Sequence, residues 1–259
     1  MEFINFTKEH GVGKIVLNRP EKFNSFVREM MMAFHAALDD CQQDEAVRCI
    51  LVTANGKAFC AGQDLGEAID EENGLDLEKI VSEHYNPCIK RLREIEKPIV
   101  AAVNGVAAGA GANIALACDI VVATESASFI QAFSKIGLIP DSGGTYTLPR
   151  LIGLQKATAL MMLGDKISAQ EAERLGMIYK YFPDDSFDAE VEKITSKLAK
   201  MPTKGLGLTK RALNLSLTNG LDTQLDIEEH LQAEAGESDD YNEGVNAFLE
   251  KRKPTFVGK

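Results

Sequence analysis

The sequence is poor in the residues that most often bind metal ions. Its 259 residues include only four histidines and five cysteines. The cysteines stand singly in apolar surroundings, with no CxxC pair and no His/Cys cluster; they are Cys41, Cys49, Cys60, Cys88 and Cys118. Isolated apolar cysteines are typical of reduced core thiols, whereas a zinc site needs grouped ligands. The sequence therefore predicts no metal site and a cytoplasmic protein.

Positive charge is also scarce. Lysine and arginine number 28 against 39 acidic residues, which gives a formal net charge of −11. This excess argues against nucleic acid or an anionic membrane surface as the main partner. Residues 1–11 (MEFINFTKEHG) also lack the basic segment and apolar stretch of a secretory signal, which again favours the cytoplasm.

Long hydrophobic runs free of polar residues are missing as well. The most apolar region, residues 98–123, carries Asn104, Asn113, Asp119 and several glycines. These residues are costly inside a lipid bilayer. A buried strand, a glycine turn and a buried helix explain the region better than a membrane span.

Strands and helices are predicted to alternate along the first part of the chain. Residues 3–6 and 14–18 predict strands, and the apolar run 47–54 predicts a strand buried on both faces. A helix should begin near Ser25, because apolar side chains recur there at helical spacing. These side chains are Phe26, Met30, Phe34, Ala37, Leu38 and Cys41.

Later segments continue the pattern and end in helices. An acidic stretch over 67–76 predicts a solvated loop, and a helix kinked at Pro87 should follow from about Leu77 to Ile95. Ser168 and Glu171 form a capping box. Strand–helix alternation followed by helices predicts an α/β core over residues 1–200 and a helical region over residues 201–259.

Two glycine-rich loops could bind a carbonyl group. FCAGQDL (59–65) and NGVAAGAGAN (104–113) each follow an apolar strand, with small residues where a helix begins. The first amides of a helix have no partner inside it, and two such amides at one point would stabilise an oxygen that gains negative charge. The alternative is that both loops are packing turns.

One carboxylate, Asp141, lies between an apolar run and two glycines in IGLIPDSGG (136–144). The run before it reads as a buried strand or a tight connection, and the residues after it predict a helix. Asp141 could cap that helix, or it could be held in an apolar pocket for proton chemistry.

Several motifs together resemble the crotonase, or enoyl-CoA hydratase/isomerase, superfamily over the whole chain. They include LNRPEKFNSF, AFCAGQDL, VNGVAAGAGANIALACDIVVA, IGLIPDSGGTYTLPRLIG, KISAQEAERLGMI and EGVNAFLEKRKP. The resemblance implies a right-handed spiral of ββα turns that binds acyl-CoA, here residues 1–200. It also implies that residues 201–259 assemble a homotrimer or a dimer of trimers, with coenzyme A as part of the substrate and no other cofactor.

The resemblance implies the roles of individual residues. The main-chain amides of Gln63 and Ala110 would hold the thioester oxygen. Hydratases of the family use two glutamates, and the matching positions here are Asn113 and Phe133, which cannot act as general acid or base. Asp141 matches the aspartate of family isomerases and would be the catalyst, desolvated by an apolar environment of Phe133, Ile136, Leu138 and Ile139.

Other residues are weaker candidates. The predicted substrate-binding positions are Lys22, Phe26, Ala61, Asp64, Asn113 and Phe133. Asn113 could equally serve the structure of its helix, and Lys22 could be an ordinary surface lysine rather than a partner of the CoA phosphates. His84 and Tyr85 lie on a helix that lines the acyl pocket in relatives, although a structural role is as plausible. We assign no chemistry to His10, His35 or His230.

The motifs are most similar to family members that isomerise the ring epoxide of phenylacetyl-CoA, a reaction that yields oxepin-CoA. Such members also move a 3,4 double bond to the 2,3 position. We therefore expect an isomerase with an oxyanion hole and one acid/base, and the alternative is a hydratase-family enzyme of fatty-acid β-oxidation. An RNA-binding or purely structural role disagrees with the acidic charge and with the predicted site.

Overall fold

The computed structural model describes residues 3–68 and 76–259, and within them the strands form two sheets. The larger has the order β1-β2-β3-β5-β7-β10 and is parallel apart from the β1–β2 pair. The smaller has the order β4-β6-β8-β9 and is parallel apart from β8–β9. The strands are β1 (Ile4–Glu9), β2 (Val12–Leu17), β3 (Cys49–Ala54), β4 (Ala58–Cys60), β5 (Ile99–Val103), β6 (Val106–Ala108), β7 (Ile120–Thr124), β8 (Ser128–Ile130), β9 (Lys166–Ser168) and β10 (Lys180–Phe182).

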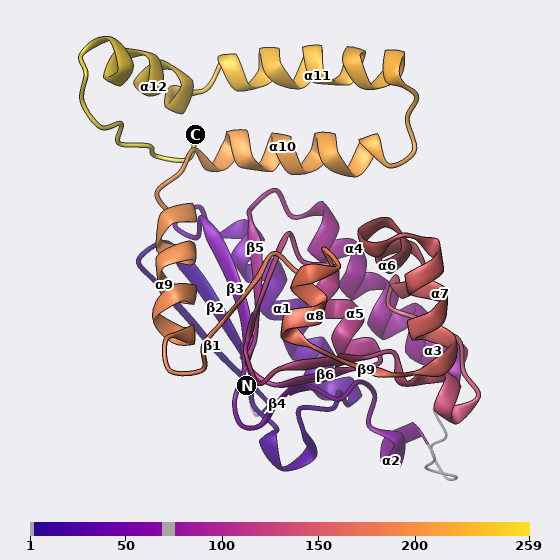
Figure 1. Cartoon of the computed structure of the whole chain (residues 1–259). Coiled ribbons are helices and arrows are strands. Elements are labelled where there is room, and N and C mark those ends of the chain that lie inside the picture. Colours follow the sequence, from indigo (N-terminus) through magenta and orange to yellow (C-terminus); the bar gives the residue numbers. More distant parts are fainter. Residues whose placement is uncertain (1–2, 69–75) are drawn as a thin grey trace.

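Successive strand pairs build a spiral. In the pairs β3–β4, β5–β6 and β7–β8, the first strand joins the larger sheet and the second joins the smaller one. Helices follow each pair before the chain returns to the next turn (Figure 1). Because each turn pairs with the one before it in both sheets, the turns stack. The predicted spiral of ββα turns is confirmed.

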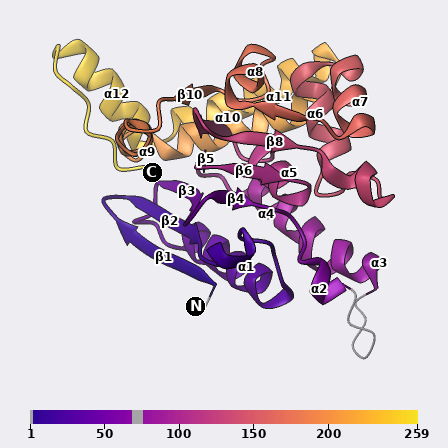
Figure 2. The same ribbon diagram turned by 60° about the horizontal axis from the view of Figure 1, so that its bottom comes forward.

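The helices flank the sheets and form the end of the chain (Figure 2). A 3-10 helix spans Pro20–Lys22, a π-helix spans Ile80–Tyr85 and a second 3-10 helix spans Ala132–Ile136. The α-helices are α1 (Arg28–Gln43), α2 (Leu65–Ala68), α3 (Leu77–Lys79), α4 (Asn86–Glu94), α5 (Ala110–Leu116), α6 (Gly144–Ile152), α7 (Leu154–Leu163), α8 (Ala169–Arg174), α9 (Phe187–Leu198), α10 (Thr203–Ser216), α11 (Leu221–Gly236) and α12 (Asp239–Leu249). None of the helices in the described part of the chain is long and apolar enough to cross a membrane.

Strand β3 shows why the core has two layers. Its side chains alternate between the faces of the sheet, so Ile50 and Val52 pack in the main cluster with α1, while Leu51 packs in a second cluster with α9. The prediction of a strand buried on both faces is confirmed. The expected apolar face of α1 is also confirmed, because the five predicted side chains that lie in the helix (Met30, Phe34, Ala37, Leu38 and Cys41) are all buried.

Three local predictions need correction or lie outside the structure. Helix α1 begins at Arg28 rather than near Ser25, because Phe26 pairs as an extended residue with Gln63. The expected helix from Leu77 to Ile95 extends from Leu77 to Glu94, but its middle part, Ile80–Tyr85, is a π-helix, and Pro87 lies in the first turn of α4. The loop predicted over 67–76 lies mostly outside the described residues.

The helices α10, α11 and α12 lie to one side of the spiral, with α10 and α11 side by side (Figure 1). Buried Lys210 of α10 joins them to the core, since its Nζ lies 2.9 Å from Oδ2 of Asp119 and donates a 2.7 Å hydrogen bond to the carbonyl of Leu92. Helix α10 begins at Thr203, close to the predicted start of the helical region at residue 201. The division into an acyl-CoA-binding core and an oligomerisation region stays a prediction.

Candidate active site

The first loop leaves the Gln63 amide free to bind a ligand. Phe26 N donates to the carbonyl of Gly62 at 2.7 Å, and Asp64 N donates to the carbonyl of Phe26 at 2.8 Å. In a parallel bridge of this kind, the N–H of the residue between the two bonds points to the opposite side. The Gln63 N–H therefore has no main-chain partner among the described residues.

The second loop supplies the Ala110 amide. Ala110 is the first residue of α5, so its N–H has no acceptor inside the helix. Gly109 precedes it with φ +52°, a conformation that side chains disfavour. A Cβ atom built on Gly62 would lie 3.4 Å from Ala110 N, so the two loops touch at this point. The structure thus brings together the two loops that carry the predicted oxyanion amides.

Asp141 does not cap the helix that follows it. The N-cap of α6 is Gly143 and accepts no side-chain hydrogen bond, while Gly144 N donates to the main-chain carbonyl of Asp141 at 2.9 Å. The Asp141 carboxylate instead accepts a 2.8 Å hydrogen bond from the Ser142 hydroxyl. Burial raises the pKa of Asp141 above its ordinary value, and the Ser142 hydrogen bond offsets only part of this effect.

The expected cause of that burial is wrong in part. Ile136, Leu138 and Ile139 are 53, 39 and 81% exposed, so they do not enclose the carboxylate in this chain. The segment is a 3-10 helix and a loop rather than a buried strand, and Gly137 ends the 3-10 helix with φ +73°. Phe133 alone of the expected apolar group is buried, and its ring lies against Gly109.

Asn113 uses its whole side chain inside the protein. Its Nδ2 donates to the carbonyl of Asp141 at 2.9 Å, and its Oδ1 accepts a 2.8 Å hydrogen bond from Gln131 Nε2. The predicted contact of Asn113 with substrate stays a prediction, whereas the structural alternative has direct support. Neither Asn113 nor Phe133 adds an ionisable group beside Asp141.

Sequence reasoning missed the hydrogen bonds made by the Gln63 side chain. Tyr85 Oη donates to Gln63 Oε1 at 2.8 Å, and Gln63 Nε2 donates to Glu67 Oε2 at 3.0 Å. Tyr85 is 1% exposed and stands at the end of the π-helix. π-Helical turns inside α-helices often occur at functional sites. No local sequence pattern predicts such a turn, so the sequence did not indicate this one.

The remaining candidates have mixed placements. Phe26 is a core residue whose ring packs edge-on against Tyr85 at 6.5 Å between centroids, so its main chain rather than its ring supports the Gln63 loop. Asp64 lies 2.6 Å from Arg19; burial alone would raise its pKa, but the hydrogen bonds from Arg19 and from Gly66 N lower it. Ala61 and Lys22 are exposed. Their contact with substrate stays a prediction.

Two of the histidines, His84 and His35, are buried and make hydrogen bonds inside the protein. His84 is 2% exposed, and its Nε2 lies 3.0 Å from Arg28 Nη1, so burial and then that guanidinium lower its pKa. His35 Nε2 binds the carbonyl of His84 at 3.0 Å.

The five cysteines are free and buried, and burial raises the pKa of the Cys60 thiol to about 12. Residues 3–68 and 76–259 hold no group of three or more His, Cys, Asp or Glu side chains that could bind a metal.

The fold is a spiral of ββα turns in which two glycine-rich loops touch, and the main-chain amides of Gln63 and Ala110 have no main-chain partner among the described residues. The family model of enoyl-CoA hydratase/isomerase matches residues 7–259. The chain belongs to the enoyl-CoA hydratase/isomerase family.

Relatives within the family include both isomerases and hydratases. The chain is 49% identical to the 1,2-epoxyphenylacetyl-CoA isomerase of Escherichia coli, with 100% of each chain covered. It is 33% identical to the 2,3-dehydroadipyl-CoA hydratase of the same organism, with 98% of each covered. The crystal structure of an enoyl-CoA hydratase from Bacillus anthracis superimposes with a TM-score of 0.92 at 32% identity, covering 99% of this chain and 100% of that one.

Proposed function

We propose that this enzyme isomerises CoA thioesters with one carboxylate, Asp141, as its acid and base. The main support is a single arrangement: the loops of Gln63 and Ala110, whose main-chain amides have no main-chain partner among the described residues, touch at Gly62. In addition, no carboxylate stands at the hydratase positions, which hold Asn113 and Phe133. The raised pKa of Asp141 suits a group that must both take and return a proton.

The proposed chemistry moves one proton through an enolate. With a 3-enoyl-CoA, Asp141 removes a proton from C2, and the electron pair spreads from C2 onto the thioester oxygen. The amides of Gln63 and Ala110 hold this negative oxygen. Asp141 then returns the proton to C4, and the double bond comes to lie between C2 and C3. The carboxylate ends in its starting state, as a catalyst must.

The preferred substrate is 2-(1,2-epoxy-1,2-dihydrophenyl)acetyl-CoA, which would rearrange to oxepin-CoA. The support is the 49% identity to a protein named 1,2-epoxyphenylacetyl-CoA isomerase over the full length of both chains. The same enolate and the same mobile proton serve the opening of the ring epoxide and the expansion of the ring. Coenzyme A enters as part of the substrate, and the proposal needs no further cofactor.

The alternative is an enoyl-CoA hydratase of fatty-acid β-oxidation. Water addition needs groups that hold and activate a water molecule. The amide of Asn113 is engaged by Asp141 and Gln131, and Phe133 is a hydrocarbon packed on Gly109. The absence of a proton-transfer group typically costs a factor of about 10² or more, so we expect hydration to be slow.

Product analysis with three substrates tests the proposal. The purified enzyme is given the ring epoxide, a 3-enoyl-CoA and crotonyl-CoA, and the products are separated by chromatography and mass. We expect oxepin-CoA and 2-enoyl-CoA to form much faster than 3-hydroxybutyryl-CoA. Rapid hydration of crotonyl-CoA without isomerisation would overturn the proposal in favour of the hydratase.

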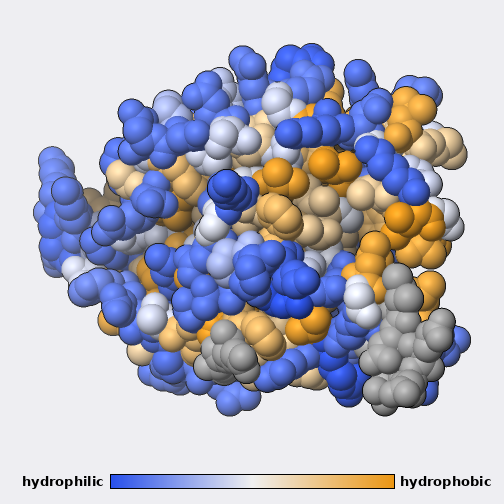
Figure 3. All heavy atoms as spheres, turned by 90° about the horizontal axis from the view of Figure 1, so that it is seen from below, coloured by the Kyte–Doolittle hydropathy of each residue, from blue (hydrophilic) through white to orange (hydrophobic). Residues whose placement is uncertain are grey.

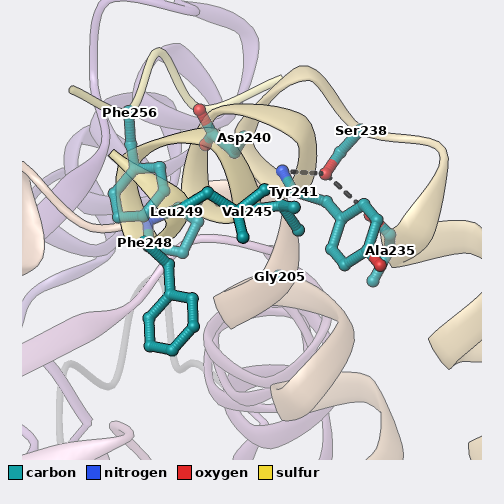
Figure 4. Close-up of a pocket in the computed structure, with 11 residues that line it drawn as sticks. Gly205, Ala235, Ser238, Asp240, Tyr241, Val245, Phe248, Leu249 and Phe256 are labelled. Carbon is teal, nitrogen blue, oxygen red and sulfur yellow. Dashed lines mark hydrogen bonds between the residues drawn. The ribbon is translucent and has the colours of Figure 1, made fainter. Parts of the chain in front are cut away.

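We also propose that the chain forms a homotrimer or a dimer of trimers. Apolar side chains of the last helix, α12, stay uncovered: Phe248 is 82% exposed and Leu249 is 71% exposed. They border an apolar cavity of about 450 Å³ together with Tyr241, Val245 and Phe256 (Figure 4). Hydrophobic surface also appears where α6 and α7 lie (Figure 3). Surfaces of this kind are typical of subunit contacts.

The cytoplasm is the compartment that we propose for the enzyme. Its five cysteines are free and buried, as expected for thiols in a reducing environment. The net charge of −11 gives no support to a nucleic-acid or membrane partner. Fractionation of the native host, followed by detection of the protein, would test this location.

A further inference from the structure

Asn113 binds the main chain of the proposed catalytic residue. Its side chain is 1% exposed, and Nδ2 donates to the carbonyl oxygen of Asp141 at 2.9 Å. Gln131, itself 2% exposed, donates from Nε2 to Asn113 Oδ1 at 2.8 Å and so fixes which end of the amide faces Asp141. The bond to Gln131 is buried and the bond to Asp141 is partly buried, and a lost hydrogen bond costs most where water cannot replace it.

Helix α5 carries both this anchor and the oxyanion amide. Ala110 is its first residue, and Asn113 follows one turn later, with Asn113 N bonded to the carbonyl of Gly109 at 3.2 Å. The regular geometry of an α-helix fixes the distance between residues one turn apart. The position of Asp141 relative to the Ala110 amide is therefore tied to a single helical turn.

The segment after Asp141 is one that needs such an anchor. Ser142 and Gly143 take φ of +51° and +70°, and a non-glycine residue rarely adopts this conformation. A side chain at Gly144 would overlap the Asn113 amide group, so the two segments are in direct contact. Such backbone conformations persist where the surrounding contacts determine them.

We infer that Asn113, held by Gln131, is a positioning residue that fixes the Asp141 carboxylate relative to the oxyanion amides. The inference rests on the proposed function, because it assigns a role to Asn113 only if Asp141 moves the proton. Asn113 thus acts through the Asp141 carbonyl rather than on the proton itself.

The test is Asn113→Ala with a 3-enoyl-CoA substrate. A misplacement of the reacting groups by about 1 Å costs on the order of 10²-fold, so we expect kcat to fall by about 10- to 100-fold with KM little changed. We also expect the acid limb of the kcat profile to move to lower pH, since a carboxylate released from its buried place regains water. A merely structural role would lower Tm without moving this limb.

Thr53→Val is the matched control. Thr53 Oγ1 donates to the carbonyl of Ala102 at 2.9 Å in the larger sheet, so the change also removes one side-chain bond to a main-chain carbonyl. It should lower Tm and leave the pH profile unchanged. If Asn113→Ala does not fold, Asn113→Leu decides, because a side chain of similar volume without an N–H cannot donate to the Asp141 carbonyl.

Asp141→Asn separates the two proposals. If Asp141→Asn is inactive while Asn113→Ala (or Asn113→Leu) keeps kcat within about twofold and the wild-type pH profile, the positioning role is wrong and the proposed function stands. If Asp141→Asn is fully active, the proposed function itself fails.

Discussion

Tyr85 Oη donates a 2.8 Å hydrogen bond to Oε1 of Gln63, the residue whose main-chain amide is one of the two proposed oxyanion donors. On its other side, Gln63 Nε2 donates to Glu67 at 3.0 Å. Both ends of the side-chain amide are therefore fixed, one by the π-helix and the other by α2. A side chain held in this way also restrains the peptide that carries the Gln63 N–H.

Tyr85→Phe should therefore reduce turnover modestly. The change keeps the ring that packs on Phe26 but leaves Gln63 Oε1 unpaired. A hydrogen bond contributes about 0.5–1.5 kcal/mol, so we expect kcat to fall by roughly 2- to 12-fold. Gln63→Ala should cause a loss of similar size, because it removes the same contact and keeps the main-chain amide. Tyr179→Phe removes an equivalent hydroxyl from a side chain that is 67% exposed, and it should leave kcat unchanged. Unchanged kcat in Tyr85→Phe would show that the side-chain contact does not restrain the amide.

Ala110→Pro should abolish one of the two oxyanion donors. Proline is tolerated at the first position of a helix, which Ala110 occupies in α5, so we expect the variant to fold. Loss of one such donor typically lowers kcat by about 10²- to 10³-fold. Ala110→Gly keeps the N–H and should remain close to wild type. A folded Ala110→Pro enzyme with normal turnover would show that this amide is not recruited.

The parts of the fold that follow local rules were predictable. The apolar spacing of α1 and the continuous apolar strand β3 both depend on residues close together in the chain, and both predictions are confirmed. The spiral itself came from the resemblance of the motifs, because strands such as β6 and β8 have only three residues each and carry no periodic signal.

The site was harder to predict in its details. The bond of Tyr85 to Gln63 spans 22 positions and the bond of Asn113 to Asp141 spans 28, so no local pattern indicates either one. Hydropathy also misled the interpretation around Asp141, since it cannot tell whether Ile139 faces the site or, as found, the outside. An apolar residue exposed in one chain is a normal finding where a partner subunit binds.

The assembly prediction can be checked by light scattering at micromolar concentration. We expect the mass of a trimer or of a hexamer. Phe248→Glu combined with Leu249→Glu places charges on two of the most exposed apolar positions of α12 and should yield smaller species. Tyr179→Glu adds a charge at another exposed aromatic position and serves as the control. A wild-type monomer would contradict the proposal.

The acid limb of the wild-type pH profile should reflect Asp141. A general base must be ionised to accept a proton, and burial raises the pKa of Asp141 above the ordinary 3.8. Turnover should therefore fall as the pH drops through a value higher than 3.8, in a profile measured with a 3-enoyl-CoA. A limb at or below the ordinary value would show that the carboxylate is solvated during the reaction.

Asp141→Asn should lose activity and gain stability at neutral pH. Asparagine has nearly the same shape but cannot accept the proton, so isomerase turnover should fall by about two to four orders of magnitude. A group whose pKa is higher in the folded state stabilises the fold below its unfolded pKa, and this contribution is lost as the pH rises through the folded pKa. At pH 7 the ionised Asp141 therefore destabilises the fold relative to a neutral amide. The Tm of Asp141→Asn should exceed that of the wild type at pH 7, and the difference should vanish below about pH 3.8, where both side chains are neutral.

A helix-capping aspartate would behave differently, because asparagine caps about as well and both turnover and Tm would hardly change. Measuring both quantities on this variant distinguishes the roles, and near wild-type turnover would end the case for Asp141 as the catalyst.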